Sequence, residues 1–226
     1  MRKSGRLVVT LIALCAVPLP IVAAEQAMPV WPDTFISRVE SLALVETLNA
    51  TLLAARSATF TLDKWCADHK LASETKIRAR LLRSVDKPVS DEQRQRLQIA
   101  SDEPVKFRHV ELACGDRILS EADNWYVPSR LTPEMNRTLE TTDTPFGRAI
   151  STLNPFRRTF AVTVLWKPLA DGWEHEALPP DHPGQALAIP SHIFEHRALM
   201  YRSDLKPVCE VDEVYTRENL AFTPPG

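Results

Sequence analysis

Two pairs of strand-length segments, each joined by a short turn, constrain the fold more than any other feature of the sequence. Residues 105–114 and 117–128 flank Gly115 and Asp116, and residues 192–202 and 207–216 flank residues 203–206. Such turns are typical of β-hairpins, whose strands pair antiparallel. Residues 157–169 form another strand-like run, and residues 76–81 alternate basic and apolar side chains. The sequence therefore predicts a meandering antiparallel sheet.

The segment before the sheet is predicted to be helical. Between Asp33 and Arg56 apolar residues recur at steps of three and four, which indicates an amphipathic helix, and Asp33 is the expected N-cap. A shorter helix is expected within residues 61–72, a polar connection with one helical turn over 86–104, and an exposed loop over 171–190. The fold class is therefore α+β, with N-terminal helices packed on one face of a mainly antiparallel β-sheet.

The first 24 residues have the pattern of a signal peptide. Three basic residues precede an apolar run over residues 7–22, and small residues end at Ala24. Pro18 and Pro20 interrupt the apolar run, so we expect cleavage after Ala24 and no stable membrane span. A lipid anchor at Cys15 is disfavoured because the preceding Leu14 is bulky. We expect residues 25–226 to form a single domain in the periplasm or outside the cell.

Charge and cysteine content narrow the function classes. The predicted signal peptide carries three of the 27 basic residues and no acidic residue, so the remaining chain has a net charge of about −5. This negative charge argues against a nucleic-acid partner. The length of the remaining chain is sufficient for one core, and we expect the domain to be a monomer. Cys66, Cys114 and Cys209 remain after cleavage, which leaves open one disulfide with a free thiol, or three reduced thiols.

One local motif has the order of a zinc-peptidase site. His192, Glu195 and His196 match H-x-x-E-H, a pattern that binds zinc when both histidines lie on one face of a helix. Pro190 and the apolar residues of this run favour a strand instead. On a strand the two histidines would share a face about 13 Å apart, too far to bind one ion together. We therefore expect no metal.

Two charged residues are predicted to lie among apolar neighbours. Arg108 shares a strand face with Val110 and Leu112, where a guanidinium is costly unless an anionic group meets it or its end extends to solvent. Glu213 has apolar neighbours on the last strand, whereas Asp212 points the other way. On adjacent strands, Arg108 and Glu213 could neutralise each other or hold the two ends of a small polar ligand.

The segments "FRHVELACGD", "TPFGR" and "KPVCEVDEVY", in this order, resemble the chorismate lyase family over about residues 44–216. That family shares its fold with the ligand-binding domains of GntR-type transcription regulators. The resemblance implies a carbon–oxygen lyase that eliminates pyruvate from chorismate, or from a related enolpyruvyl compound, to leave 4-hydroxybenzoate or a similar product. It also implies that neither a metal nor an organic cofactor takes part.

The resemblance also assigns residues. Arg108 matches the arginine that pairs with the ring carboxylate, and Glu213 matches the glutamate at the hydroxyl end, with Asp212 as the fallback. These are the expected catalytic residues. The expected substrate-binding positions are Phe146, Gly147, Arg148 and Ala58.

The sequence departs from the family at one charged position. Lyases carry Gly-Arg where Asp123 and Asn124 stand here, which removes a positive charge expected to bind the second carboxylate. The predicted export adds a second departure, because chorismate is made in the cytosol. The alternative to a lyase is therefore a non-catalytic periplasmic module that binds a small aromatic carboxylate. A third interpretation is a structural envelope protein in which Arg108 and Glu213 only pair with each other.

Overall fold

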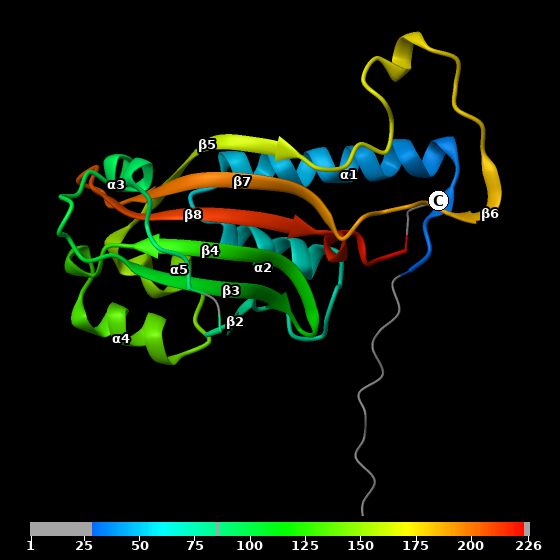
Figure 1. Ribbon diagram of the computed structural model, residues 1–226. Coiled ribbons are helices and arrows are strands. Elements are labelled where there is room, and N and C mark those ends of the chain that lie inside the picture. The colour runs from blue at the N-terminus through cyan, green and yellow to red at the C-terminus, as the bar shows by residue number, and fades with distance from the viewer. Residues whose placement is uncertain (1–28, 85, 224–226) are drawn as a thin grey trace, which may run out of the picture.

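A computed structural model describes residues 29–84 and 86–223, so the predicted signal peptide and the residue considered for a lipid anchor lie outside the described residues. The described chain forms a six-stranded sheet in the order β2-β3-β4-β8-β7-β5, in which every neighbouring pair is antiparallel (Figure 1). The strands are β2 (Arg78–Leu81), β3 (Lys106–Cys114), β4 (Arg117–Tyr126), β5 (Phe156–Val164), β7 (His192–Tyr201) and β8 (Pro207–Thr216). Both predicted hairpins, β3–β4 and β7–β8, are confirmed.

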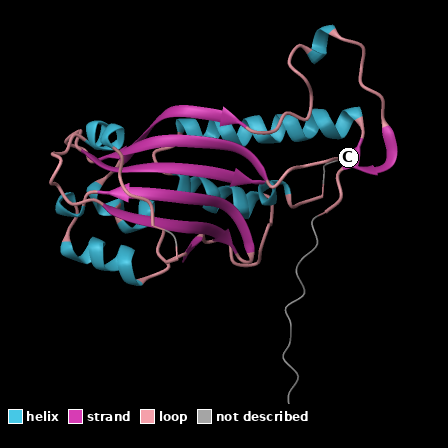
Figure 2. Ribbon diagram, in the orientation of Figure 1, coloured by secondary structure: helices cyan, strands magenta, loops and turns pink. Residues whose placement is uncertain are grey.

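Helices cover one face of this sheet, which we call the inner face, and one short helix, α3, lies on the opposite face (Figure 2). The helices are α1 (Phe35–Ala54), α2 (Ala58–Asp68), α3 (Asp91–Leu97), α4 (Pro133–Thr141) and α5 (Phe146–Ala149). Leu48 of α1 and Leu62 of α2 pack with Leu112 and Tyr215 of the sheet in the main core. The α+β class is therefore confirmed. Leu97 of α3 packs instead with Leu199 and Val127 in a separate small cluster.

Several local predictions differ from the structure. Thr34 caps α1 by accepting a hydrogen bond from the Ser37 backbone N–H, and Asp33 pairs with Arg38 and His182 instead. Asp33 was therefore wrongly predicted as the cap, because its carboxylate has two cationic partners within reach. The segment over 171–190 also contains a short strand, β6 (His182–Ala186), which pairs with β1 (Pro32–Asp33).

A disulfide between Cys66 and Cys114 joins α2 to the end of β3, and Cys209 is a buried free thiol. This arrangement is the first of the two that the sequence left open. Gly115 follows the disulfide with φ +57°, the left-handed conformation that a two-residue hairpin turn requires. Within the described ranges, no helix has both the length and the apolar character needed to cross a bilayer.

Candidate ligand-binding site

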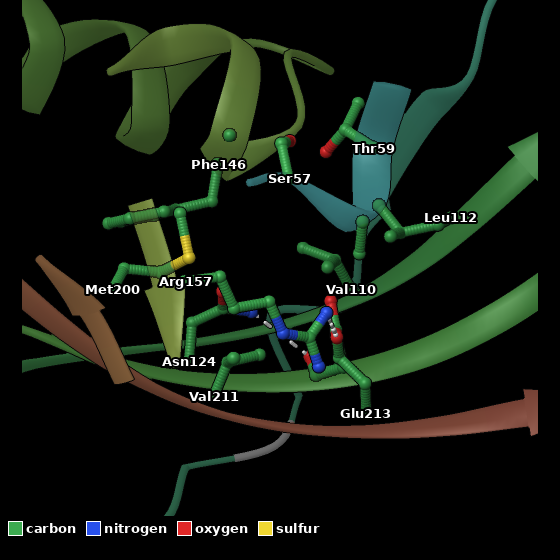
Figure 3. Close-up of a pocket in the computed structure, with 13 residues that line it drawn as sticks. Ser57, Thr59, Val110, Leu112, Asn124, Phe146, Arg157, Met200, Val211 and Glu213 are labelled. Atoms are coloured by element: carbon green, nitrogen blue, oxygen red, sulfur yellow. Dashed lines mark hydrogen bonds and ion pairs between the residues drawn. The ribbon is translucent and has the colours of Figure 1, made fainter. Parts of the chain in front are cut away.

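A small cavity of about 30 Å³ lies between the inner face of the sheet and the start of α2 and α5. Figure 3 shows Ser57, Thr59 and Phe146 on one side of this space and the Arg157 guanidinium beside Glu213 on the other. Val110 and several other apolar side chains of the sheet complete the lining. Since one water needs roughly 10–15 Å³, the cavity has room for about two waters.

Glu213 forms an ion pair inside this cavity, but its partner is Arg157. Arg157 Nη1 lies 2.6 Å from Glu213 Oε2, with side-chain exposures of 2% and 8%. The Tyr215 hydroxyl donates to the same carboxylate oxygen at 2.9 Å. Burial lowers the pKa of Arg157, but the Glu213 carboxylate and Tyr215 outweigh this effect and raise that pKa. Glu213 is therefore held as a hydrogen-bond acceptor.

Arg108 and Glu213 do not lie on adjacent strands, because β4 lies between β3 and β8, so the alternative in which they neutralise each other is wrong. The Arg108 side chain is buried at 3% exposure, and its Nη2 donates to the Thr144 backbone carbonyl at 2.9 Å. Its Nε and Nη1 are buried and have no hydrogen-bond partner among the described residues. Burial lowers the pKa of Arg108 to about 10, so the guanidinium remains charged at neutral pH.

Arg108 also lines a larger cleft of about 450 Å³ at the end of β2, beside α4. Arg83, Lys106 and Tyr126 line the same cleft. Asn124, the cross-strand neighbour of Arg108, lines the internal cavity. Arg108 therefore stands beside the boundary between the cleft and the cavity, where a group entering from the cleft would meet it.

The structure brings together most of the substrate-binding positions that the resemblance implies. Ala58, Phe146 and Gly147 line the cavity with Glu213. A Cβ on Gly147 would lie 2.5 Å from the Ser57 hydroxyl oxygen, so this residue must be small for α5 to approach α2. Arg148 is not among the lining residues, because its Nη2 binds the Asp63 carboxylate at 2.9 and 3.0 Å.

Asp212 does not lie in the cavity and is therefore not an alternative to Glu213 as the site carboxylate. It faces Arg197 across the strand pair, and alternation places it on the sheet face opposite Glu213. Burial and the neighbouring Glu195 raise the pKa of Asp212 to about 6. Its chemistry is therefore separate from the cavity.

Arg157 is the site residue that sequence reasoning missed. It stands next to Arg158 on β5, a strand at the edge of the sheet with a largely exposed surface. Phe160, Val162 and Val164 share the parity of Arg158, so simple alternation would bury Arg158. The structure instead buries Arg157 and leaves these apolar side chains exposed.

The histidines of the H-x-x-E-H motif lie on β7, as the strand prediction requires, but the prediction that they share a face is wrong. A bulge between His192 and Phe194 changes the alternation. His196 is buried against Asn49 of α1, with its Nε2 2.8 Å from the amide oxygen, whereas His192 lies near Glu121. Burial and Arg157 lower the pKa of His196 to about 4. In the described part of the chain, no cluster of three or more possible metal ligands occurs.

Comparison with solved structures finds several proteins of low sequence identity. PhnF of Mycobacterium smegmatis aligns with a TM-score of 0.47 and 12% identity over 88% of this chain and 92% of that chain. A GntR-family regulator of Enterococcus faecalis aligns with a TM-score of 0.38 and 14% identity over 61% of this chain and 92% of that chain. The possible transcriptional regulator YydK of Bacillus subtilis aligns with a TM-score of 0.40 and 15% identity. The alignment covers 66% of this chain and 62% of YydK, which is less than two thirds of YydK.

Sequence comparison identifies a much closer relative. No protein-family model matches the chain. An uncharacterized protein of Sinorhizobium fredii, y4mC, is 48% identical over 196 residues, which is 86% of this chain and 83% of that protein. The chain therefore belongs to the same protein family as y4mC of Sinorhizobium fredii.

Proposed function

We propose that this protein is exported and binds a small aromatic carboxylate through Arg108. The observation that carries the proposal is the state of the Arg108 guanidinium, which is buried and charged while Nε and Nη1 lack partners within the described ranges. An unpaired buried charge is costly, and a carboxylate is the ligand group that best offsets this cost. The adjoining cleft of about 450 Å³ gives such a ligand a route to the guanidinium.

The lining of the cavity favours a ligand with an apolar body. Val110, Ala122 and Val211 present apolar side chains beside Asn124, so a ring can contact the sheet while its carboxylate binds Arg108. A ring is larger than the present space of about 30 Å³. Binding therefore requires side chains to move, and Met200, an unbranched and adaptable side chain, is the candidate to do so.

Pyruvate elimination is the second candidate function, and the buried carboxylate of Glu213 in this cavity favours it. The reaction breaks the ring carbon–oxygen bond of the enolpyruvyl ether and removes one ring proton, so the ring becomes aromatic. The enolpyruvate leaves with the electron pair of the broken bond and takes up a proton to become pyruvate. Glu213, which accepts from Arg157 and Tyr215, would orient the ring hydroxyl as an acceptor rather than donate a proton. The cavity would exclude water from the reacting bond.

The disulfide supports export. Disulfides persist in oxidising compartments such as the periplasm and are rare in the cytosol, and Cys66 and Cys114 are joined here.

The direct test is titration of the purified protein with 4-hydroxybenzoate by calorimetry. We expect wild type to bind, Arg108→Met to lose at least about tenfold in affinity, and Arg80→Met to bind as wild type does. Arg80 is the matched control because it pairs with Asp116 at the surface, away from the cavity. Unchanged binding by Arg108→Met would contradict the proposal. Release of pyruvate from chorismate, abolished in Glu213→Gln, would establish the lyase.

A further inference from the structure

Arg157 has hydrogen-bond donors that its ion pair with Glu213 does not use. Its Nη1 contacts Glu213 and Tyr215, while its buried Nε and Nη2 have no hydrogen-bond partner in the described chain. These two nitrogens form one edge of the guanidinium, whose N–H groups point the same way and can share one acceptor. Buried donors without acceptors reduce stability, and an acceptor at this edge would remove that cost.

The charges around the cavity do not balance. Among the described residues that line it, only Arg157 and Glu213 carry a charge. Arg108, whose cross-strand neighbour Asn124 lines the same cavity, is also buried, and it donates to backbone carbonyl groups rather than to a carboxylate. Two buried guanidinium groups therefore share one carboxylate, which favours an anion over a water as the missing acceptor.

The volume of the cavity limits which anion fits. A space of about 30 Å³ holds about two waters, or one monatomic ion and one water. It is too small for phosphate or sulfate, each of which has four oxygen atoms around a central atom. The cavity as it stands therefore suits a halide.

Ser57 supplies another unused donor, on the opposite side of the cavity (Figure 3). It occupies the N-cap position of α2 but makes no capping hydrogen bond, and its buried hydroxyl has no partner among the residues that the structure describes. A serine at this position normally accepts a hydrogen bond from a backbone N–H of the helix. The hydroxyl is therefore available to donate to a water beside the ion.

We propose that the cavity holds a buried halide ion, chloride under ordinary ionic conditions, at the Nε–Nη2 edge of Arg157, with Ser57 bound to it through a water. Glu213 contacts Nη1, so the guanidinium lies between the two anions. The ion balances the second buried positive charge in the protein without its ligand. Because a ligand ring would need the same space, the ion and the ligand proposed for Arg108 exclude each other.

The first measurement is the melting temperature of the purified protein at constant ionic strength, with sodium gluconate exchanged stepwise for sodium chloride. Gluconate is the reference anion because it is too large for the cavity. A ligand that binds only the folded state raises the melting temperature once its concentration exceeds its dissociation constant. We expect a saturating rise of about 3–6 °C at roughly ten times the dissociation constant of chloride. A wild-type melting temperature that does not respond to chloride would overturn the inference.

Variants assign the response to residues. Arg157→Met/Glu213→Gln removes both charges of the buried pair and should abolish the saturating rise. Glu213→Gln alone should keep the rise or move it to lower chloride concentration, because a like charge is lost while Arg157 remains. Ser57→Ala should move it severalfold to higher concentration. Arg158→Met, which removes an exposed arginine on the same strand, is the matched control and should respond as wild type does. A double variant that keeps the wild-type rise would contradict the assignment to Arg157.

Anomalous diffraction from wild-type crystals grown in sodium bromide locates the ion directly. We expect one bromide peak inside the cavity, within hydrogen-bonding distance of Nε and Nη2 of Arg157. Waters alone in the cavity, or bromide only at the protein surface, would overturn the inference even if the melting temperature responds to chloride. None of these measurements uses an aromatic ligand, so their failure leaves the carboxylate site at Arg108 to its own test.

Discussion

Removing the positive charge of Arg157 is expected to destabilise the protein strongly. Arg157→Met leaves the Glu213 carboxylate in a site where its side chain is 8% exposed, with Tyr215 as its remaining donor. Breaking a buried ion pair by removing one partner costs about 3–5 kcal/mol. For a domain of this size each kcal/mol corresponds to about 2–4 °C, so the melting temperature should fall by roughly 10 °C.

The double variant separates the charge from the packing. In Arg157→Met/Glu213→Gln no charge remains in the buried pair, and replacing a buried ion pair with neutral groups is often close to neutral. We expect most of the lost stability to return. Arg158→Met is the matched control, because Arg158 is exposed, and its loss should change the free energy of unfolding by less than about 1 kcal/mol.

Urea denaturation followed by circular dichroism measures these differences at neutral pH without ligand. The reasoning depends on the order of the variants, with Arg157→Met well below both the double variant and Arg158→Met. If Arg157→Met and the double variant unfold at the same urea concentration, Glu213 is not left as an unpaired buried charge, and the description of the pair is refuted.

Three further predictions concern packing, the disulfide and pH. Gly147→Ala should cost about 1–3 kcal/mol, because its Cβ would lie 2.5 Å from Ser57 Oγ, and adding Ser57→Ala should recover much of this loss in a double-mutant cycle. Cys66→Ala/Cys114→Ala should lower the free energy of unfolding by about 4 kcal/mol, given the 48-residue separation, and dithiothreitol should then destabilise wild type but not the variant. Burial and Glu195 raise the pKa of Asp212 from 3.8 to about 6, so its stabilising contribution is present below about pH 4 and is lost as the pH rises through 6. Asp212→Asn should therefore flatten the pH dependence of the melting temperature between pH 4 and pH 6, and an unchanged slope would contradict this assignment.

Local sequence patterns predicted the sheet because the relevant interactions are local. The β3–β4 hairpin follows from alternation on both sides of Gly115, and the same alternation places Arg108 on the buried face. The long helix α1 follows from its apolar periodicity. These features depend on neighbours within a few residues, so the sequence pattern is sufficient to predict them.

The missed features depend on contacts between distant segments. Asp33 and Thr34 are adjacent residues that both suit a helix cap, and only the positions of Arg38 and His182 decide between them. The bulge in β7 inserts one residue and moves His192 off the face that carries His196. Arg157 is distinguished from Arg158 only by the orientation of an edge strand. No local pattern records these choices.

The interpretation of this protein as a purely structural module required Arg108 and Glu213 to satisfy each other. The structure gives Glu213 a different partner, Arg157, and leaves Arg108 with backbone carbonyl acceptors only. Two buried guanidinium groups with unused donors reduce stability unless another molecule satisfies them. A ligand that does so binds the folded state selectively and stabilises it in proportion to its concentration. Thermal stabilisation by an aromatic carboxylate, dependent on Arg108, is therefore what distinguishes a binding site from a structural ion pair.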